Sequence, residues 1–163
     1  KDTVIELSKM MRYVLYDSEN AATNLVSEMR FIENYIALMR IRYTDNVDVR
    51  FTVHDTVRPT AKVPPLLFIV LVENAFKHGV SYNKPSYVNI DVWCDEKQVS
   101  CQVQNSRHEQ AAISKQSTKS SGMGLDNIRK RLDLLFGEEY NLAIDDSNKE
   151  QYTIKLTIPI KND

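Results

Sequence analysis

The sequence predicts a two-layer α/β (α+β) sandwich, in which helices cover one face of a mixed, largely antiparallel sheet, with further helices preceding it. Two observations predict this fold class. Apolar residues alternate with a period of two in four or five short stretches. Between and before these stretches they recur every three or four residues, as on one face of a helix. A chain of 163 residues with 42% hydrophobic residues suits one domain with a buried core.

The first helical stripes fall at about residues 3–16 and 24–43. The second stripe has spacings of 4-3-4-3-4 and comprises Leu25, Met29, Ile32, Ile36, Met39 and Tyr43. Charged residues are expected on its other faces: Glu28, Arg30, Glu33 and Arg40. The pattern fits a seam with a partner helix and packing onto the same domain equally well.

The remaining elements follow in order along the chain. A strand is predicted at 47–53, a loop at 54–63, and a helix at 65–78 that begins at a proline pair. Two strands joined by residues 95–97 come next. Residues 105–121 are polar and predict a long mobile loop. The next helix is expected to stop at Gly137, before a final hairpin, and its apolar face comprises Leu125, Ile128, Leu132 and Leu135.

Polar residues gather where the apolar helix at 65–78 ends. Glu73 lies four residues before Lys77, and Asn74 lies four residues before His78, so each pair shares a helix face. Gly79 is a suitable C-cap. Taken alone, this stretch is equally compatible with a solvated helix end.

A second stretch, Ser121 to Arg129, contains two glycines and leads into the next helix. Gly122 and Gly124 let backbone approach a bulky anion, and the helix start offers free N–H groups to phosphate. The stretch lacks the Gly-Lys-Ser/Thr of a P-loop and the third glycine of a Rossmann fingerprint. By itself it also fits an ordinary loop hinge. With Asn74 as an oxygen ligand for Mg²⁺, the two stretches together describe a nucleotide site.

The two stretches resemble characteristic boxes of the GHKL ATPase superfamily. Residues 73–79, Glu-Asn-x-x-Lys-His-Gly, are similar to its N box, and residues 121–125 to its G2 box. The Gly-x-Gly-Leu-x-Asn spelling from Gly122 and the Pro-Pro-Leu at 64–66 resemble the LytS-like sensor histidine kinases. The resemblance extends from about Leu25 to Pro159 and implies the GHKL, or histidine kinase ATPase, fold.

The resemblance implies the ATP-binding catalytic domain of a two-component sensor histidine kinase with ATP and Mg²⁺ as cofactors. It implies that Asn74 holds Mg²⁺ through its side-chain oxygen and that Glu73 assists phosphoryl transfer beside it. The remaining ATP-binding residues that it implies, some near the phosphates and one near adenine, are Lys77, His78, Asn105, Gly122, Met123, Gly124 and Leu125.

The resemblance also divides the chain. Residues 1–23 correspond to the tail of a dimerisation or linker helix, and residues 24–163 to the catalytic domain, with its first helix at 24–43 and an ATP lid at 106–121. The family's acceptor histidine lies on an earlier helix, and His54, His78 and His108 do not suit that role. We therefore expect an acceptor-histidine helix outside this chain, a response regulator as partner and a homodimeric full-length protein. The domain is expected to be cytoplasmic, in a membrane-anchored bacterial sensor.

The sequence departs from the family at the G1 box. Asn105 stands where the family has an aspartate that accepts a hydrogen bond from adenine, and the glycines that follow it are missing. A neutral amide can still accept that bond, but without ionic character. One alternative is therefore a non-catalytic regulatory or dimerisation module with a degenerate nucleotide site. A second alternative is a GHKL serine kinase of the anti-sigma type, which shares the fold; the proline pair at 64–65 and the Arg-Leu at 131–132 disfavour it. The near balance of 21 basic and 22 acidic residues gives no reason to propose nucleic acid as a partner.

Overall fold

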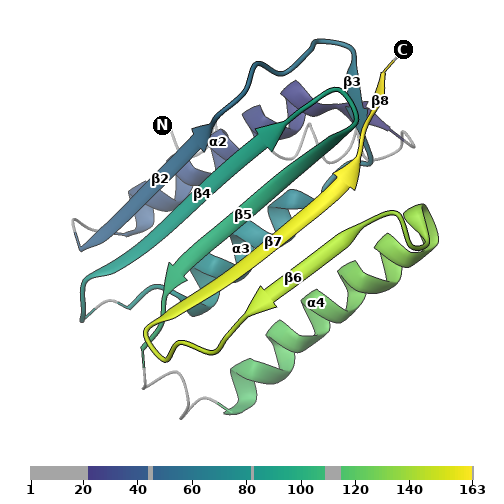
Figure 1. The fold of residues 1–163 in the computed structure, drawn as a ribbon. Coiled ribbons are helices and arrows are strands. Elements are labelled where there is room, and N and C mark those ends of the chain that lie inside the picture. The colour runs from purple at the N-terminus through teal and green to yellow at the C-terminus, as the bar shows by residue number, and fades with distance from the viewer. Residues whose placement is uncertain (1–21, 44–45, 82, 109–114, 163) are drawn as a thin grey trace.

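The computed structural model describes residues 22–43, 46–81, 83–108 and 115–162, and it describes no side chains at 115–124 or 162. The expected helix at 3–16 lies outside these residues. A five-stranded sheet forms one layer and three helices form the other (Figure 1). The predicted fold class is therefore confirmed. Among the described residues, no helix is both long and apolar enough to span a bilayer.

The main sheet has the strand order β2-β4-β5-β7-β6. Its strands are β2 (Val47–Val53), β4 (Ser86–Cys94), β5 (Gln98–Ser106), β7 (Gln151–Pro159) and β6 (Asn141–Asp145). β2 runs parallel to β4, and the other neighbours are antiparallel. Alternation decides which face is buried: in β5, Val99, Cys101 and Val103 are fully buried beneath the helices, whereas the residues between them are partly exposed.

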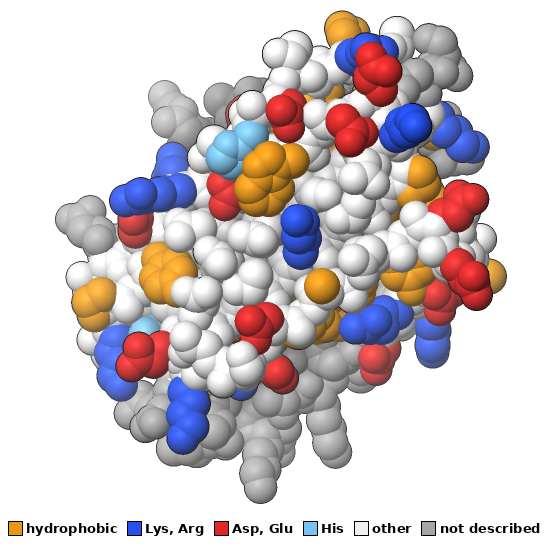
Figure 2. All heavy atoms as spheres, viewed as in Figure 1, with side chains coloured by type: hydrophobic (Ala, Val, Ile, Leu, Met, Phe, Trp, Pro, Cys, Tyr) orange, Lys and Arg blue, Asp and Glu red, His pale blue; other side chains and the backbone are white. Residues whose placement is uncertain are grey.

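The other face of the sheet is open. Figure 2 shows acidic and basic side chains intermixed on it, with only scattered hydrophobic ones. Its aromatic Trp93 is covered by other side chains: the His54 ring stacks on it at a centroid distance of 4.9 Å, and Lys155 Nζ lies 5.3 Å from its centroid. We expect no functional site from this face.

The helical layer consists of α2 (Leu25–Arg42), α3 (Phe68–His78) and α4 (Lys115–Phe136). α3 lies between the other two and is buried along most of its length, with Leu71, Val72 and Ala75 at most 1% exposed. α2 packs on it through Tyr35, whose ring meets Phe76 edge-on at 5.7 Å. The stripe at 25–43 thus packs, at least in part, within the domain.

The structure also contains a second, smaller sheet that the sequence pattern does not predict. It has the order β1-β3-β8 and consists of β1 (Thr23–Asn24), β3 (Ala61–Val63) and β8 (Lys161–Asn162). These strands have two or three residues each, too few to display a recognisable period. The sheet ties the start of α2 to the segment that precedes α3 and to the end of the chain.

The boundaries of α4 and α3 differ from the prediction. α4 begins at Lys115, ten residues before the predicted start at Leu125, so residues 115–121 are helical and are not loop. Residues 115–121 contain neither proline nor glycine, and extending an existing helix adds one hydrogen bond per residue. α3 begins at Phe68, and not at residue 65, because Leu66 has a φ of 61° that no right-handed helix can include.

Two side chains also differ from expectation. The sequence pattern places Glu28 on an outer face of α2, but it is fully buried and its Oε1 accepts a hydrogen bond from the Leu66 N–H at 2.9 Å. The pattern places Leu135 on the core face of α4, but it is 44% exposed, because Ile128 and Leu132 fill the space beneath the helix.

The positive φ of Leu66 predicts an unusual order of stability. A non-glycine residue in this region costs about 1 kcal/mol relative to glycine. Leu66→Gly and Leu66→Ala both remove the packing of the leucine side chain, but only the alanine variant retains the conformational free-energy cost of a positive φ. We expect Leu66→Gly to be the more stable by about 1 kcal/mol in chemical denaturation. At positions with a negative φ, alanine is more stable than glycine. If Leu66→Ala were likewise more stable than Leu66→Gly, the positive φ of Leu66 would be contradicted.

Candidate functional site

The candidate site lies at the end of α3, next to the end of β5. The helix ends on Gly79, whose N–H donates to the Ala75 carbonyl at 2.7 Å. Ser106, the last residue of β5, donates from its Oγ to the Gly79 carbonyl at 2.6 Å. The same Oγ accepts the N–H of Tyr87 from β4 at 3.1 Å. The polar end of α3 is thereby fixed to two strands of the sheet, a contact that sequence reasoning missed.

Gly79 is required by the packing at this point. A Cβ on Gly79 would clash with Nδ2 of Asn105 and would lie 2.6 Å from its Cβ. Asn105 is 2% exposed and donates from Nδ2 to the Ser106 carbonyl at 2.9 Å. This bond fixes the orientation of the amide, and its Oδ1 has no hydrogen-bond partner among the described residues. A buried, unpartnered acceptor is costly, and it fits a ligand that supplies a donor.

The charged groups at the end of α3 have shifted pKa values. Burial raises the pKa of the Glu73 carboxyl group, and Lys77 partly opposes this shift. Burial, together with Lys77, lowers the pKa of His78, whose Nε2 is buried and has no described partner. Burial, and then the carboxylate of Glu73, raises the pKa of the Tyr35 hydroxyl group on α2. Glu73 therefore lies close to Tyr35, a neighbour that no sequence motif indicates.

α4 lies antiparallel to α3. Arg131, late in α4, donates from Nη2 to the Pro65 carbonyl at 2.5 Å and from Nη1 to the Leu66 carbonyl at 3.4 Å, just before α3 begins. Leu125 precedes Arg131 by six residues, and Asn74 follows Phe68 by six residues, or about 9 Å along each helix. In Figure 1 the start of α4 and the end of β5 lie at the same end of the sheet. The antiparallel packing therefore brings Leu125 towards Asn74.

The predicted residues of the glycine stretch fall inside α4. Gly122, Met123 and Gly124 belong to the helix, their side chains are not described, and Leu125 is partly buried. The expected start of a helix at Leu125, with free N–H groups, is therefore not present in this structure. Two glycines cost about 1 kcal/mol each in a helix interior, so this part of α4 is its least stable turn.

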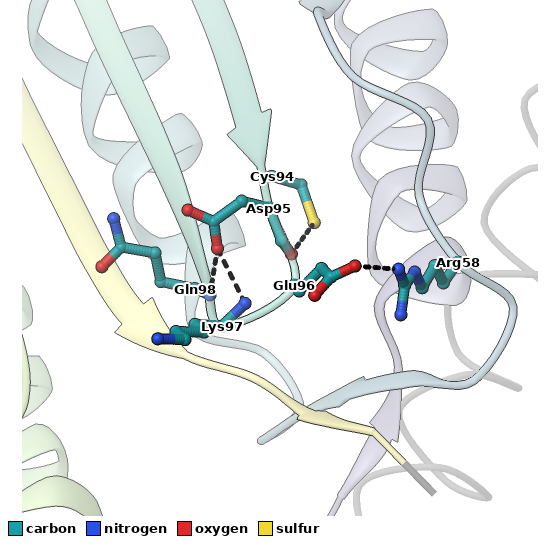
Figure 3. Close-up of polar contacts among 6 residues, drawn as sticks. All are labelled: Arg58, Cys94, Asp95, Glu96, Lys97 and Gln98. Atoms are coloured by element: carbon teal, nitrogen blue, oxygen red, sulfur yellow. Dashed lines mark hydrogen bonds and ion pairs between the residues drawn. The ribbon is translucent and has the colours of Figure 1, made fainter.

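A separate hollow of about 300 Å³ lies at the opposite end of β5, near the turn that joins it to β4. Figure 3 shows how the polar groups there already bind one another: Asp95 accepts the N–H groups of Lys97 and Gln98, and Arg58 pairs with Glu96. None of the predicted site residues lines this hollow. Among the described residues, no cluster of three His, Cys, Asp or Glu side chains suits a metal ion. A Mg²⁺ ion held by one amide oxygen and by phosphate needs no such cluster.

Comparisons with known proteins show which family the chain resembles. The family model described as histidine kinase matches residues 1–47. The chain is 32% identical to the sensor protein LytS of Staphylococcus saprophyticus over 99% of its own length and 29% of that protein. It is 26% identical to the sensor histidine kinase YesM of Bacillus subtilis over 97% of its own length and 28% of that protein. The chain thus spans less than a third of these relatives.

Solved structures share the fold. The catalytic domain of histidine kinase ThkA has a TM-score of 0.56 with 17% identity, over 87% of this chain and 97% of that domain. ThkA in complex with the response regulator protein TrrA gives a TM-score of 0.52 with 15% identity, over 96% of this chain and 48% of that one.

The packing of Gly79 predicts a large cost for its smallest substitution. Gly79→Ala drives a methyl group into Asn105 and should destabilise the protein by about 2 kcal/mol or more. Gly137→Ala is the matched control, because Gly137 has a φ of 62° but no atom within 4 Å of an added Cβ. That variant should lose only about 1 kcal/mol. Equal losses in denaturant titrations would show that Gly79 and Asn105 are not in close contact.

The lowered pKa of His78 predicts a pH dependence of stability. In the unfolded chain His78 takes up its proton near its ordinary pKa of 6.5, whereas in the folded protein it does so only at lower pH. The contribution of neutral His78 is therefore present above that value and is lost as pH falls through the folded pKa. Between pH 7.5 and 5.5, wild type should lose more unfolding free energy than His78→Gln. Identical losses in the two proteins would contradict the shift.

Proposed function

The chain belongs to the LytS-type sensor histidine kinases, and we propose that it is the ATP-binding catalytic domain of such a kinase. In this proposal it binds Mg²⁺-ATP and transfers the γ-phosphoryl group to a histidine outside these 163 residues. That histidine then supplies a response regulator. The observation that carries the proposal is the antiparallel packing of α3 and α4, which directs Asn74 and Leu125 to one end of the molecule.

The polar end of α3 suits the metal, and the end of β5 suits the base of the nucleotide. The half-buried amide of Asn74 offers Mg²⁺ the hard oxygen that this ion prefers. Bound there, the ion would neutralise charge on the phosphate oxygens. Asn105 offers its unpartnered Oδ1 to the exocyclic amino group of adenine. Guanine carries an acceptor at that place, so Asn105 would favour ATP over GTP.

The charged residues of α3 suit the chemical step. Glu73, with a carboxyl pKa above its ordinary value, can hold or accept a proton near the reacting groups. Lys77 supplies positive charge on the same side of the helix. His78 stays neutral to lower pH than a free imidazole and can act as a hydrogen-bond donor or acceptor. Catalysis would consist mainly of positioning and charge neutralisation, as is general for phosphoryl transfer.

The phosphates would bind the backbone from Gly122 to Leu125. In the helical state of α4 the N–H groups of these residues point along the helix to carbonyls four residues earlier. We propose that the turns before Leu125 open when nucleotide binds, which frees these N–H groups and leaves Leu125 at the start of a shorter helix. The two glycines favour this opening because they stabilise the helix least. The segment 106–121 would then act as the ATP lid.

The expected partners and location remain part of the proposal. They are the acceptor-histidine helix of the same kinase, a response regulator, and a second copy of the full-length protein. The domain would lie on the cytoplasmic side of a membrane-anchored bacterial sensor, with residues 1–23 as the tail of its dimerisation or linker helix. The ThkA structure that matches this chain contains a response regulator.

One observation favours a second function. Asn105 replaces an ionic acceptor with a neutral one, and its Nδ2 is already committed to the Ser106 carbonyl. If adenine binding is too weak for turnover, the chain would serve as a regulatory or dimerisation module. Transfer of phosphate to a supplied acceptor domain distinguishes the two functions.

The proposal predicts that Asn74→Ala abolishes Mg²⁺-dependent ATP binding in calorimetry, because the variant loses the oxygen that completes the metal's coordination. Metal-independent binding should fall less. Asn141→Ala, at an exposed asparagine of β6, is the matched control and should bind as wild type does. Unchanged Mg²⁺-ATP affinity in Asn74→Ala would overturn the assignment of this site.

A further inference from the structure

Leu66 has a backbone conformation that its own side chain disfavours. It is the one non-glycine residue in the described part of the chain with a positive φ, at 61°. Such a conformation persists only where the surroundings hold it in place. Leu66 lies two residues before the first residue of α3, whose far end carries the candidate site.

Both sides of the Leu66 backbone are held by ionisable side chains from other helices. Glu28 of α2 accepts the Leu66 N–H at 2.9 Å. Arg131 of α4 donates to the Leu66 carbonyl at 3.4 Å and to the Pro65 carbonyl at 2.5 Å. We call Glu28, Pro65, Leu66 and Arg131 the Leu66 junction. It joins all three helices of the layer through one residue.

The two sides of the junction are held strongly for different reasons. The guanidinium group of Arg131 is ionised, and hydrogen bonds from an ionised donor are roughly twice as strong as neutral ones. Glu28 is completely buried, so the bond at its Oε1 is shielded from competition with water. Arg131 donates to two successive carbonyls from the two terminal nitrogens of its planar guanidinium group, a rigid geometry that the flexible ammonium group of a lysine lacks. These bonds offset the cost of the positive φ.

The junction connects the two parts of the chain that matter for a kinase. Glu28 lies within residues 1–47, the segment that matches the histidine kinase family model. Arg131 lies six residues after Leu125, on the helix that contains Gly122 and Gly124. A movement of α2 that withdraws Glu28 would let Leu66 relax to a negative φ. The Leu66 carbonyl would then turn away from Arg131, and α4 would lose its anchor beside α3.

We propose that Glu28 and Arg131 are positioning residues that couple the placement of α2 to that of α4, so that the N-terminal helices control phosphoryl transfer. This inference rests on the proposed function. A displaced α4 would shift the backbone that binds the phosphates, whereas the end of α3 and β5, which the junction does not touch, would still hold the metal and the base. A displacement of α4 by about 1 Å can slow a reaction far more than it weakens binding. The junction therefore governs the transfer rate more than nucleotide affinity.

The test uses the complete kinase that contains residues 1–163, with Glu28→Ala, Glu28→Gln, Arg131→Met and the double variant Glu28→Ala/Arg131→Met. Glu28→Ala and Arg131→Met should each slow transfer about tenfold while the ATP dissociation constant changes less than about threefold. The transfer rate of the double variant should lie within about threefold of the rate of either single variant, because both substitutions break the same junction. Glu28→Gln keeps an acceptor oxygen and should transfer within about threefold of wild type.

Three results would overturn the inference: effects that multiply to about a hundredfold in the double variant, a Glu28→Gln variant as slow as Glu28→Ala, or equal changes in affinity and rate. Backbone hydrogen exchange separates this failure from that of the proposed function. Glu28→Ala should speed exchange between Leu125 and Phe136 on α4 even without nucleotide. Unchanged exchange there refutes the junction, whereas a wild type that transfers no phosphate refutes only the kinase assignment.

Discussion

The antiparallel packing of α3 and α4 is the constraint on which the structure's function depends. Arg131 fixes the relative position of the two helices by donating to the Pro65 and Leu66 carbonyls, so the length of each helix from that point decides which residues meet. Asn74 lies six residues after Phe68, the first residue of α3, and Leu125 lies six residues before Arg131 on α4. Neither helix could shift by a turn without losing these bonds and exposing apolar residues such as Leu71 and Leu132, both of which are 0% exposed.

The sheet supplies the second fixed point. β5 ends on Asn105, which packs against Gly79, and on Ser106, which donates a hydrogen bond to the Gly79 carbonyl, so the polar end of α3 cannot move independently of the strands. The same packing accounts for the chemistry expected there. It buries Asn105 with its Oδ1 unpartnered among the described residues. Near it on α3, burial raises the pKa of Glu73 and lowers the pKa of His78, and both shifts favour the neutral form of the side chain. A polar ligand would supply hydrogen bonds that the protein alone leaves unmade.

The sequence predicts the parts of the fold that have a clear period or motif. The alternating strands and the buried stripe of α3 are confirmed, because one face of each is packed in the core. The prediction is wrong where long-range contacts decide. Glu28 has the charge of a surface residue, yet a backbone N–H 38 residues away donates to it within the core. The glycines predict a start of α4 near Leu125, although helix extension from the packed turns reaches Lys115. The roles of Asn74, Gly122 and the other site residues remain predictions.

The central claim is that the end of α3 and the glycine stretch of α4 share one bound nucleotide. Backbone hydrogen exchange, followed as Mg²⁺-ATP is titrated into the protein, tests it most directly. We expect the amides of residues 74–79 to become protected and those of residues 115–121 to exchange faster as α4 opens, with both changes following a single saturation curve. A response at only one of these segments, or two curves with different midpoints, would contradict the claim.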